Sequence, residues 1–326
     1  MKERRLPPER GVVEGNDAAG GGASTPSFAL PDGATPGVPG APRPLTIGPT
    51  TFEWGRRTYV MGVLNVTPDS FSGDGLLASG DPVTTAVALG SRMVADGADL
   101  LDVGGASSRP GHADIAAPDE TARVVPVIRA IAAALPQMVI SVDTTSPVVA
   151  DAALDAGAHL VNDVWGVADD PAMVRLAARR GVPIVLMHNR GEARYRNLVP
   201  EVIGDLQRAI ERALDAGVPW DHLLVDPGFG FGKTPDHNLA LMANLRALRV
   251  LGRPVLLGTS RKSTLGRILD LPAGERVEAT VATTALGIAA GVDMVRVHDV
   301  RENVRAARTA DAIERGWRPA GWEVRP

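Results

Sequence analysis

The chain has 326 residues, of which 44% are hydrophobic, enough to bury one large core. Its formal net charge of −4 and pI near 5.9 exclude the general basic surface that nucleic-acid binding needs. There is no cysteine, and no apolar run approaches the roughly 20 residues of a membrane span, which excludes disulfides, cysteine nucleophiles and membrane insertion. With no secretory signal at the N-terminus either, we expect a cytoplasmic protein.

The first 45 residues differ in composition from the rest of the chain. They hold eight Gly and eight Pro, and no apolar periodicity runs through them. Such a segment cannot bury enough apolar surface to offset the entropy of ordering, so we expect a disordered tail over residues 1–45. The following stretch, LTIGPTTFEWGRRTYVMGVLN, indicates a short hairpin that leads into a buried strand. We expect one folded domain over residues 46–318 and a C-terminal tail over residues 319–326.

From residue 59 on, short apolar runs alternate with Ala-, Leu- and Arg-rich segments of helical periodicity, many of which end at Gly. Eight such units in about 270 residues predict an α/β fold, a closed (β/α)8 TIM barrel. An open doubly wound sheet is the alternative, but it would need a GxGxxG loop after its first strand, which GVLNVTPDSFSGDG lacks. The expected strands are 59–64, 99–103, 138–142, 158–162, 182–187, 222–225, 254–258 and 292–297.

Polar side chains follow the expected strands at the ends that meet at the mouth of such a barrel. Helix capping explains any one of them alone, and their convergence favours a binding site. Carboxylates and amides suit a heterocycle with amino and ring N–H donors, whereas Arg and His suit a phosphate-bearing group. The positions are Asn65, Asp102, Asp143, Asn162, Asp163, Met187, His188, Asp226, Ser260, Lys262, Arg296 and His298, with Arg109 in a neighbouring loop.

Lysine is rare, because only Lys2, Lys233 and Lys262 occur among 34 basic residues. An arginine fork cannot copy the geometry of a compact ammonium with three donors, so the two lysines in Gly- and Ser-rich loops are candidates for a specific role. Survival by chance on a solvated surface is the alternative, above all for Lys233. For His188 we expect a structural role at its strand end, in preference to that of a general base.

Seven segments stand out along residues 46–315, namely MGVLNVTPDSFSGDG (61–75), DVGGASSRPG (102–111), SVDTTSPVVADAAL (141–154), NDVWG (162–166), DPGFGFGKTPDHN (226–238), GTSRKSTLG (258–266) and RVHDV (296–300). They resemble, in order, the successive signatures of the dihydropteroate synthase family, and the resemblance extends over essentially all of residues 46–315. It implies a transferase that condenses 6-hydroxymethyl-7,8-dihydropterin diphosphate with 4-aminobenzoate, uses Mg²⁺ and forms a homodimer through its late helices.

The resemblance also implies roles for the residues that match the family's motifs. The implied pterin-binding residues are Asp143, Asn162, Met187, Asp226, Phe231 and Lys262. The implied diphosphate-binding residues are Asn65, Arg109, Arg296 and His298, of which Asn65 would also meet Mg²⁺. The implied contacts of 4-aminobenzoate are Phe71, Ser108, Pro110 and Ser260. The implied catalytic residues are Asp143, Lys262, Arg296, His298 and Arg109.

Some positions depart from the family's pattern. Ala106 stands where the family usually has Glu, Ser108 where it has Thr, and the loop Arg190–Arg196 has no expected role.

Two other functions are considered. A methyltetrahydrofolate:corrinoid methyltransferase would share the barrel and the pterin pocket but has no need of NVTPDSF, SSRPG or SRK. A non-catalytic pterin-binding paralogue would be supported only by Ala106 and by the first loop, where residues 70–75 read SFSGDG and the family more often has SFSDGG.

Overall fold

The computed structural model describes residues 41–67, 81–106 and 115–322. Residues 1–40 of the expected N-terminal tail and residues 323–326 of the expected C-terminal tail therefore lie outside the described residues. Within the described part, Leu45 is buried and already belongs to the first strand. The folded part therefore includes one residue that the sequence had assigned to the tail.

An antiparallel hairpin precedes the barrel, as the sequence predicted, and pairs β1 (Leu45–Ile47) with β2 (Thr50–Phe52). The other strands are β3 (Tyr59–Asn65), β4 (Leu100–Gly104), β5 (Val139–Asp143), β6 (Leu160–Asp163), β7 (Ile184–Met187), β8 (Leu223–Asp226), β9 (Leu256–Leu257) and β10 (Met294–Val297). The α-helices are α1 (Pro82–Ala95), α2 (Ala117–Ala134), α3 (Pro147–Asp155), α4 (Ala172–Arg180), α5 (Leu198–Asp215), α6 (Pro235–Ala243), α7 (Ser263–Leu269), α8 (Val277–Ala289) and α9 (Val300–Glu314). Short 3-10 helices cover Trp220–His222, Leu245–Leu251 and Ala273–Glu275.

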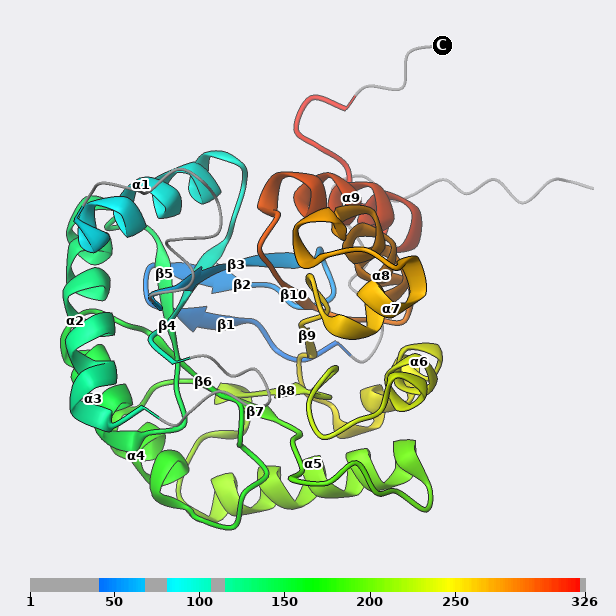
Figure 1. Cartoon of the computed structure of the whole chain (residues 1–326), viewed down its shortest axis with the longest axis horizontal. Coiled ribbons are helices and arrows are strands. Elements are labelled where there is room, and N and C mark those ends of the chain that lie inside the picture. The colour runs from blue at the N-terminus through cyan, green and yellow to red at the C-terminus, as the bar shows by residue number, and fades with distance from the viewer. Residues whose placement is uncertain (1–40, 68–80, 107–114, 323–326) are drawn as a thin grey trace, which may run out of the picture. The chain divides into compact units, whose positions relative to one another are not determined.

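The strands β3 to β10 form one parallel sheet in the order β8-β7-β6-β5-β4-β3-β10-β9. A parallel bridge between Val225 and Val255 joins the two outer strands, and the Val225 amide donates to the Pro254 carbonyl at 3.0 Å. The sheet therefore closes on itself, and the helices surround it (Figure 1). This confirms the predicted (β/α)8 TIM barrel. None of the described helices combines the length and the apolar character that crossing a membrane requires.

Side chains along each barrel strand alternate between the interior and the surrounding helices. In β5, for example, Ile140 and Val142 pack in the layer between strands and helices, whereas Val139 packs inside the barrel. The interior begins with an apolar layer near the start of the strands. This layer consists of Tyr59, Met61, Leu100, Val139, Leu160, Val185, Leu224, Leu256 and Met294.

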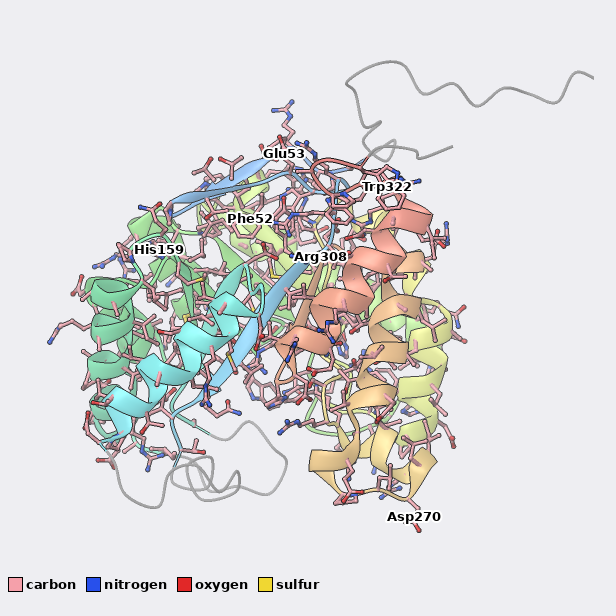
Figure 2. The ribbon with its side chains drawn as sticks, turned by 90° about the horizontal axis from the view of Figure 1, so that it is seen from above. Phe52, Glu53, His159, Asp270, Arg308 and Trp322 are labelled. Atoms are coloured by element: carbon pink, nitrogen blue, oxygen red, sulfur yellow. The ribbon has the colours of Figure 1, made fainter. Side chains whose placement is uncertain are left out.

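The hairpin closes the end of the barrel where the strands begin. Phe52 is fully buried and packs with the apolar interior layer, with its ring centre 5.3 Å from that of Trp54 and 4.6 Å from that of Tyr59. In Figure 2, Phe52 and His159, which directly precedes β6, lie at one end of the barrel, and Asp270, which follows α7, lies at the other. The end where the strands finish is therefore the one left for a binding site.

Candidate active site

Polar side chains of neighbouring strands project into the barrel beyond the apolar layer. Each lies two or four positions after an interior apolar residue of its own strand, so the period of two turns it to the same face. All of these residues are buried except Arg296, whose side chain is 19% exposed. The structure thus brings together the polar residues Asp102, Asp143, Asn162, Asp226 and Arg296, with the apolar Met187 in register beside Asp226.

Arg296 links two carboxylates across the barrel interior. Its Nε donates to Asp102 Oδ2 at 2.6 Å, and its Nη2 donates to Asp143 Oδ2 at 2.6 Å. Asn162 Nδ2 donates to the same Asp102 oxygen at 3.0 Å. The second oxygen of Asp102, Oδ1, is buried and has no hydrogen-bond partner among the described residues. A buried acceptor without a partner is costly, so this oxygen suits an N–H donor of a bound ligand.

The electrostatics of this cluster place a titration close to neutral pH. Burial raises the pKa of Asp143 to about 7; the charge of Arg296 opposes this shift, and the charge of Asp102 adds to it. Burial also raises the pKa of Asp163 to about 6. Burial lowers the pKa of Arg296, but the charges of Asp102 and Asp143 outweigh it, so the guanidinium stays charged. The carboxyl of Asp143, which accepts a hydrogen bond from Arg296, therefore gains or loses its proton around neutral pH.

A second pair of opposite charges faces the same space. A methyl group built on Gly258 would lie 3.8 Å from Arg296 Cβ, 3.9 Å from Lys262 Nζ and 4.0 Å from Asp226 Oδ2. Burial lowers the pKa of Lys262 to about 8, and the charge of Asp226 opposes the shift. Burial raises the pKa of Asp226, and the charge of Lys262 opposes that shift. The site therefore combines two cations with three buried carboxylates.

Aromatic and apolar side chains border this charged space. Lys262 Nζ lies 4.3 Å from the centre of the Phe231 ring and donates to the Phe229 carbonyl. Phe231 is half-buried, whereas Phe229 is fully buried in the packing behind it. Met187, at the end of β7, is the register neighbour of Asp226 on β8. These contacts give a planar ligand an apolar wall beside its hydrogen-bonding groups.

Ser260 and His298 form a pair next to this space. Ser260 Oγ lies 3.0 Å from His298 Nδ1 and accepts the His298 backbone N–H at 3.1 Å. The hydroxyl thus contacts both the backbone and the ring of His298, and these two contacts orient the imidazole. Ser260 is only 6% exposed, so its position supports a role in orienting His298. Its contact with 4-aminobenzoate, expected from the sequence, stays a prediction.

The remaining predicted residues lie at or beyond the rim. Asn65, at the end of β3, is half-buried and pairs in register with Gly104 of β4. Four predicted residues lie outside the described residues, namely Phe71, Ser108, Arg109 and Pro110.

The structure adds two residues to those assigned a role from the sequence. Asp102, named only as a strand-end residue, accepts bonds from both Arg296 and Asn162. Its position two residues after the interior residue Leu100 was the signal that could have found it. Lys233 Nζ lies 2.9 Å from Nδ1 of the fully buried His188, and burial lowers the pKa of His188 to about 4.

The chain is similar in sequence and in structure to known proteins. The family model described as "Pterin binding enzyme" matches residues 61–298. A dihydropteroate synthase of Clostridium beijerinckii is 47% identical over 272 residues, which are 83% of this chain and 100% of the relative. The crystal structure of a Clostridium difficile dihydropteroate synthase in the presence of pteroic acid is 43% identical, with a TM-score of 0.77, over 81% of this chain and 99% of that one. A Xanthomonas albilineans dihydropteroate synthase with 4-aminobenzoic acid is 42% identical, with a TM-score of 0.74, over 79% of this chain and 96% of that one.

Replacing Arg296 by Met should lower the free energy of unfolding by about 3–5 kcal/mol at pH 8, because two carboxylates are then buried without their cation. The loss should be smaller at pH 5. Since the pKa of Asp143 is raised from 3.8 to about 7, ionisation of this carboxyl costs stability as pH rises through that range. Urea unfolding of both proteins at pH 5 and pH 8 measures the two effects.

Arg57→Met is the matched control for this measurement. Arg57 also donates two hydrogen bonds to one aspartate, Asp99, at 3.0 and 2.6 Å, but its side chain is 36% exposed. Its replacement should cost about 1 kcal/mol or less at both pH values, as for a partly exposed pair. Equal losses for the two variants at pH 8 would contradict the role given to Arg296.

Proposed function

Since the chain belongs to the dihydropteroate synthases among the pterin-binding enzymes, we infer that it joins 6-hydroxymethyl-7,8-dihydropterin diphosphate to 4-aminobenzoate, giving 7,8-dihydropteroate and diphosphate. The observation that carries this inference is the 47% identity that extends over the whole of a dihydropteroate synthase. It favours this reaction over a methyltetrahydrofolate:corrinoid methyltransferase. The acceptor-rich interior between Asp102, Asp143 and Asp226 supports it, because a pterin ring presents amino and N–H donors.

We propose that the pterin ring binds inside the barrel between the two charged pairs. Its donors would face Asp143, Asp226, Asn162 and the unpartnered Oδ1 of Asp102. Lys262 would donate to a ring carbonyl or nitrogen, in place of its bond to a loop carbonyl. The apolar walls would be Met187 and Phe231.

The diphosphate would lie at the mouth, next to the pterin. His298 Nε2, Asn65 and Arg109 are its proposed partners. The position of Arg296 modifies the expectation from the sequence, because its Nε and Nη2 already serve Asp102 and Asp143. The two N–H groups of Nη1, which make no hydrogen bond to a described residue, and the second N–H of Nη2 are then left for a phosphate oxygen. Arg296 thus contributes to both halves of the site, which the sequence had treated as separate.

The proposed reaction replaces one bond at the exocyclic methylene carbon of the pterin. The C–O bond to diphosphate breaks, the amine nitrogen of 4-aminobenzoate forms a C–N bond, and that nitrogen then releases a proton. Negative charge grows on the leaving diphosphate while the pterin becomes cationic. Buried carboxylates such as Asp143 and Asp226 stabilise the cation, and the donors at the mouth stabilise the leaving group. The aryl amine is itself nucleophilic, so no serine or cysteine nucleophile is required.

Mg²⁺ remains a proposal, and the residues present are compatible with it. Among the described residues, no group of three His, Asp or Glu side chains could hold a metal ion. This agrees with an ion that keeps several water ligands and binds through one or two protein oxygens together with substrate phosphates. Asn65, half-buried at the end of β3, would supply such an oxygen. When bound, the ion would neutralise charge on the diphosphate.

The purified protein should release diphosphate from the pterin substrate only when 4-aminobenzoate is added, with dihydropteroate formed in equal amount. Removal of Mg²⁺ with a chelator should reduce the rate at least tenfold, and Asn65→Ala should raise the Mg²⁺ concentration needed for half-maximal rate. A protein that binds the pterin substrate in isothermal titration without forming product would instead be the non-catalytic paralogue. A rate that does not respond to the chelator would remove Mg²⁺ from the proposal.

Replacing Lys262 by Ala should reduce turnover at least tenfold while the fold survives. Because the pKa of Lys262 is lowered to about 8, the wild-type kcat/KM for the pterin substrate should fall above pH 8, when the ammonium loses its charge. Lys262→Arg should be slower at neutral pH but should lack this decline, since a guanidinium stays charged. The pH profiles of the three proteins, normalised to pH 6.5, test this. A decline that persists unchanged in Lys262→Arg would assign it to another group.

We also propose that the protein is a homodimer that associates through α8 and α9. Leu286 on α8 is 64% exposed and Ile313 on α9 is 75% exposed, and the two helices pack against each other. Sedimentation equilibrium should give twice the chain mass of 34.0 kDa, and Leu286→Asp should shift the mass toward the monomer. A wild-type protein that sediments as a monomer at micromolar concentration would refute the dimer.

The cytoplasmic location expected from the sequence is likewise a proposal. Cell fractionation that recovers the protein with the membrane or outside the cell would contradict it.

A further inference from the structure

Lys233 holds the loop between β8 and α6 from within. Its Nζ donates to the carbonyls of Gly228 at 3.0 Å and Phe231 at 3.1 Å, and it lies 2.9 Å from His188 Nδ1. An ammonium has three N–H donors, and here each one has an acceptor. A planar guanidinium could not reach three acceptors arranged in this way, which explains a lysine in a chain that otherwise uses arginine.

The loop that Lys233 holds has no room to shift toward its neighbour. Gly228 and Gly232 have φ of +68° and +53°, values that favour glycine. A Cβ on Gly228 would collide with the His188 carbonyl oxygen, and one on Gly232 would collide with the backbone of Arg190. The Tyr195 hydroxyl also donates to the Gly232 carbonyl at 2.9 Å. The loop therefore packs directly on the segment that follows β7.

His188 connects this loop to α5. Because Lys233 donates to Nδ1, the ring proton resides on Nε2 and is donated to Asp205 Oδ2 at 3.0 Å. Burial, followed by the charge of Lys233, lowers the pKa of His188 to about 4, so the ring is neutral. Arg190 donates to the same Asp205 oxygen from Nε at 2.9 Å and pairs with Glu201 at 2.8 Å. The segment Arg190–Arg196, for which the sequence indicated no role, thus anchors the end of this network.

The two lysines of the barrel hold the same loop in different ways. Lys262 donates to the carbonyl of Phe229, and it is also the residue that the proposed function assigns to the pterin. It must therefore exchange one acceptor for another when the ligand binds. Lys233 faces only protein acceptors and has no such exchange to make. Its bonds keep Phe231 in place whatever the acceptor of Lys262.

We propose that Lys233 is a positioning residue for pterin binding. Lys233, His188, Asp205 and Arg190 together form a network of hydrogen bonds, here called the clamp. The clamp fixes the Gly228–Phe231 loop, and with it the Phe231 ring, while Lys262 exchanges its loop carbonyl for the ligand. This proposal rests on the proposed function, because it takes the pterin as the ligand of Lys262. The clamp acts through the loop, so it should affect the pterin substrate far more than 4-aminobenzoate.

Lys233→Met removes the three donors and leaves an unbranched apolar side chain that is one atom shorter. At pH 6.5, below the pKa of about 7 to which burial lowers the Lys233 amine, the KM for the pterin substrate should rise at least tenfold. The KM for 4-aminobenzoate should stay within about twofold of wild type. Arg212→Met is the control, because it removes a cation from α5 that contacts the Val167 carbonyl and not the clamp. It should leave both KM values unchanged.

A chemical rescue separates positioning from loss of fold. The chain has no cysteine, so Lys233→Cys carries a single thiol. Alkylation with 2-bromoethylamine then rebuilds a lysine analogue, whereas 1-bromopropane adds a chain of equal length without the amine. The first product should recover the pterin KM to within about threefold of wild type, and the second should not. Equal kinetics for the two products would overturn the proposal, as would a Lys233→Met enzyme whose pterin KM is unchanged while its melting temperature and active fraction fall.

The small number of lysines allows a direct observation of both groups in the wild-type enzyme. Lysine labelled with ¹³C at Cε should give three signals, for Lys2, Lys233 and Lys262. Addition of the pterin diphosphate should shift the Lys262 signal and leave that of Lys233 in place. A large shift of Lys233 would mean that the clamp rearranges on binding, contrary to the proposal.

A wild-type enzyme that makes no dihydropteroate would refute the proposed function. If the wild-type enzyme does make product and the Lys233 variants behave like wild type, only the clamp is refuted.

Discussion

The polar half of the barrel depends on the balance of buried charge around Arg296. Carboxylates removed from water are tolerated only when cations and hydrogen bonds compensate them, and Arg296 provides this for Asp102 and Asp143 together. Lys262 does the same for Asp226. Without these cations, acidic residues at the strand ends could not point into the barrel. The barrel interior would then have to be apolar along its whole length, up to the end where the strands finish.

The same balance prepares the site for its substrate. In the proposed reaction, a pterin that turns cationic as diphosphate departs would meet carboxylates already in place, and no protein dipole would have to reorient at that moment. The raised pKa of Asp143, about 7, and the lowered pKa of Lys262, about 8, follow from burial, the condition that also strengthens their interaction with the ligand. Stability and chemistry therefore draw on one set of contacts. Perturbed titrations of this kind are typical of functional sites.

A second layer of contacts holds the aromatic wall of the site. Phe231 belongs to a loop in which Gly228 and Gly232 lie against the segment after β7 so closely that no side chain would fit. Lys233 and His188 tie that loop to α5 through Asp205. These contacts would keep the geometry of the loop while Lys262, in the proposed function, exchanges its loop carbonyl for the ligand.

The sequence by itself determined the barrel, the approximate strands and the polar strand ends, because short apolar runs and helix signals are local. It also indicated that Asp143, Asp226 and Lys262 would converge, since all strand ends of a closed parallel barrel meet at one mouth. Only the tertiary structure decided that Arg296 pairs with Asp102 and Asp143, that Ser260 orients His298, and that Lys233 serves the loop of Phe231. The two partners of each contact lie on different strands or loops. Which of the nearby groups bond to each other depends on side-chain length, rotamer and burial, and no local sequence pattern records these.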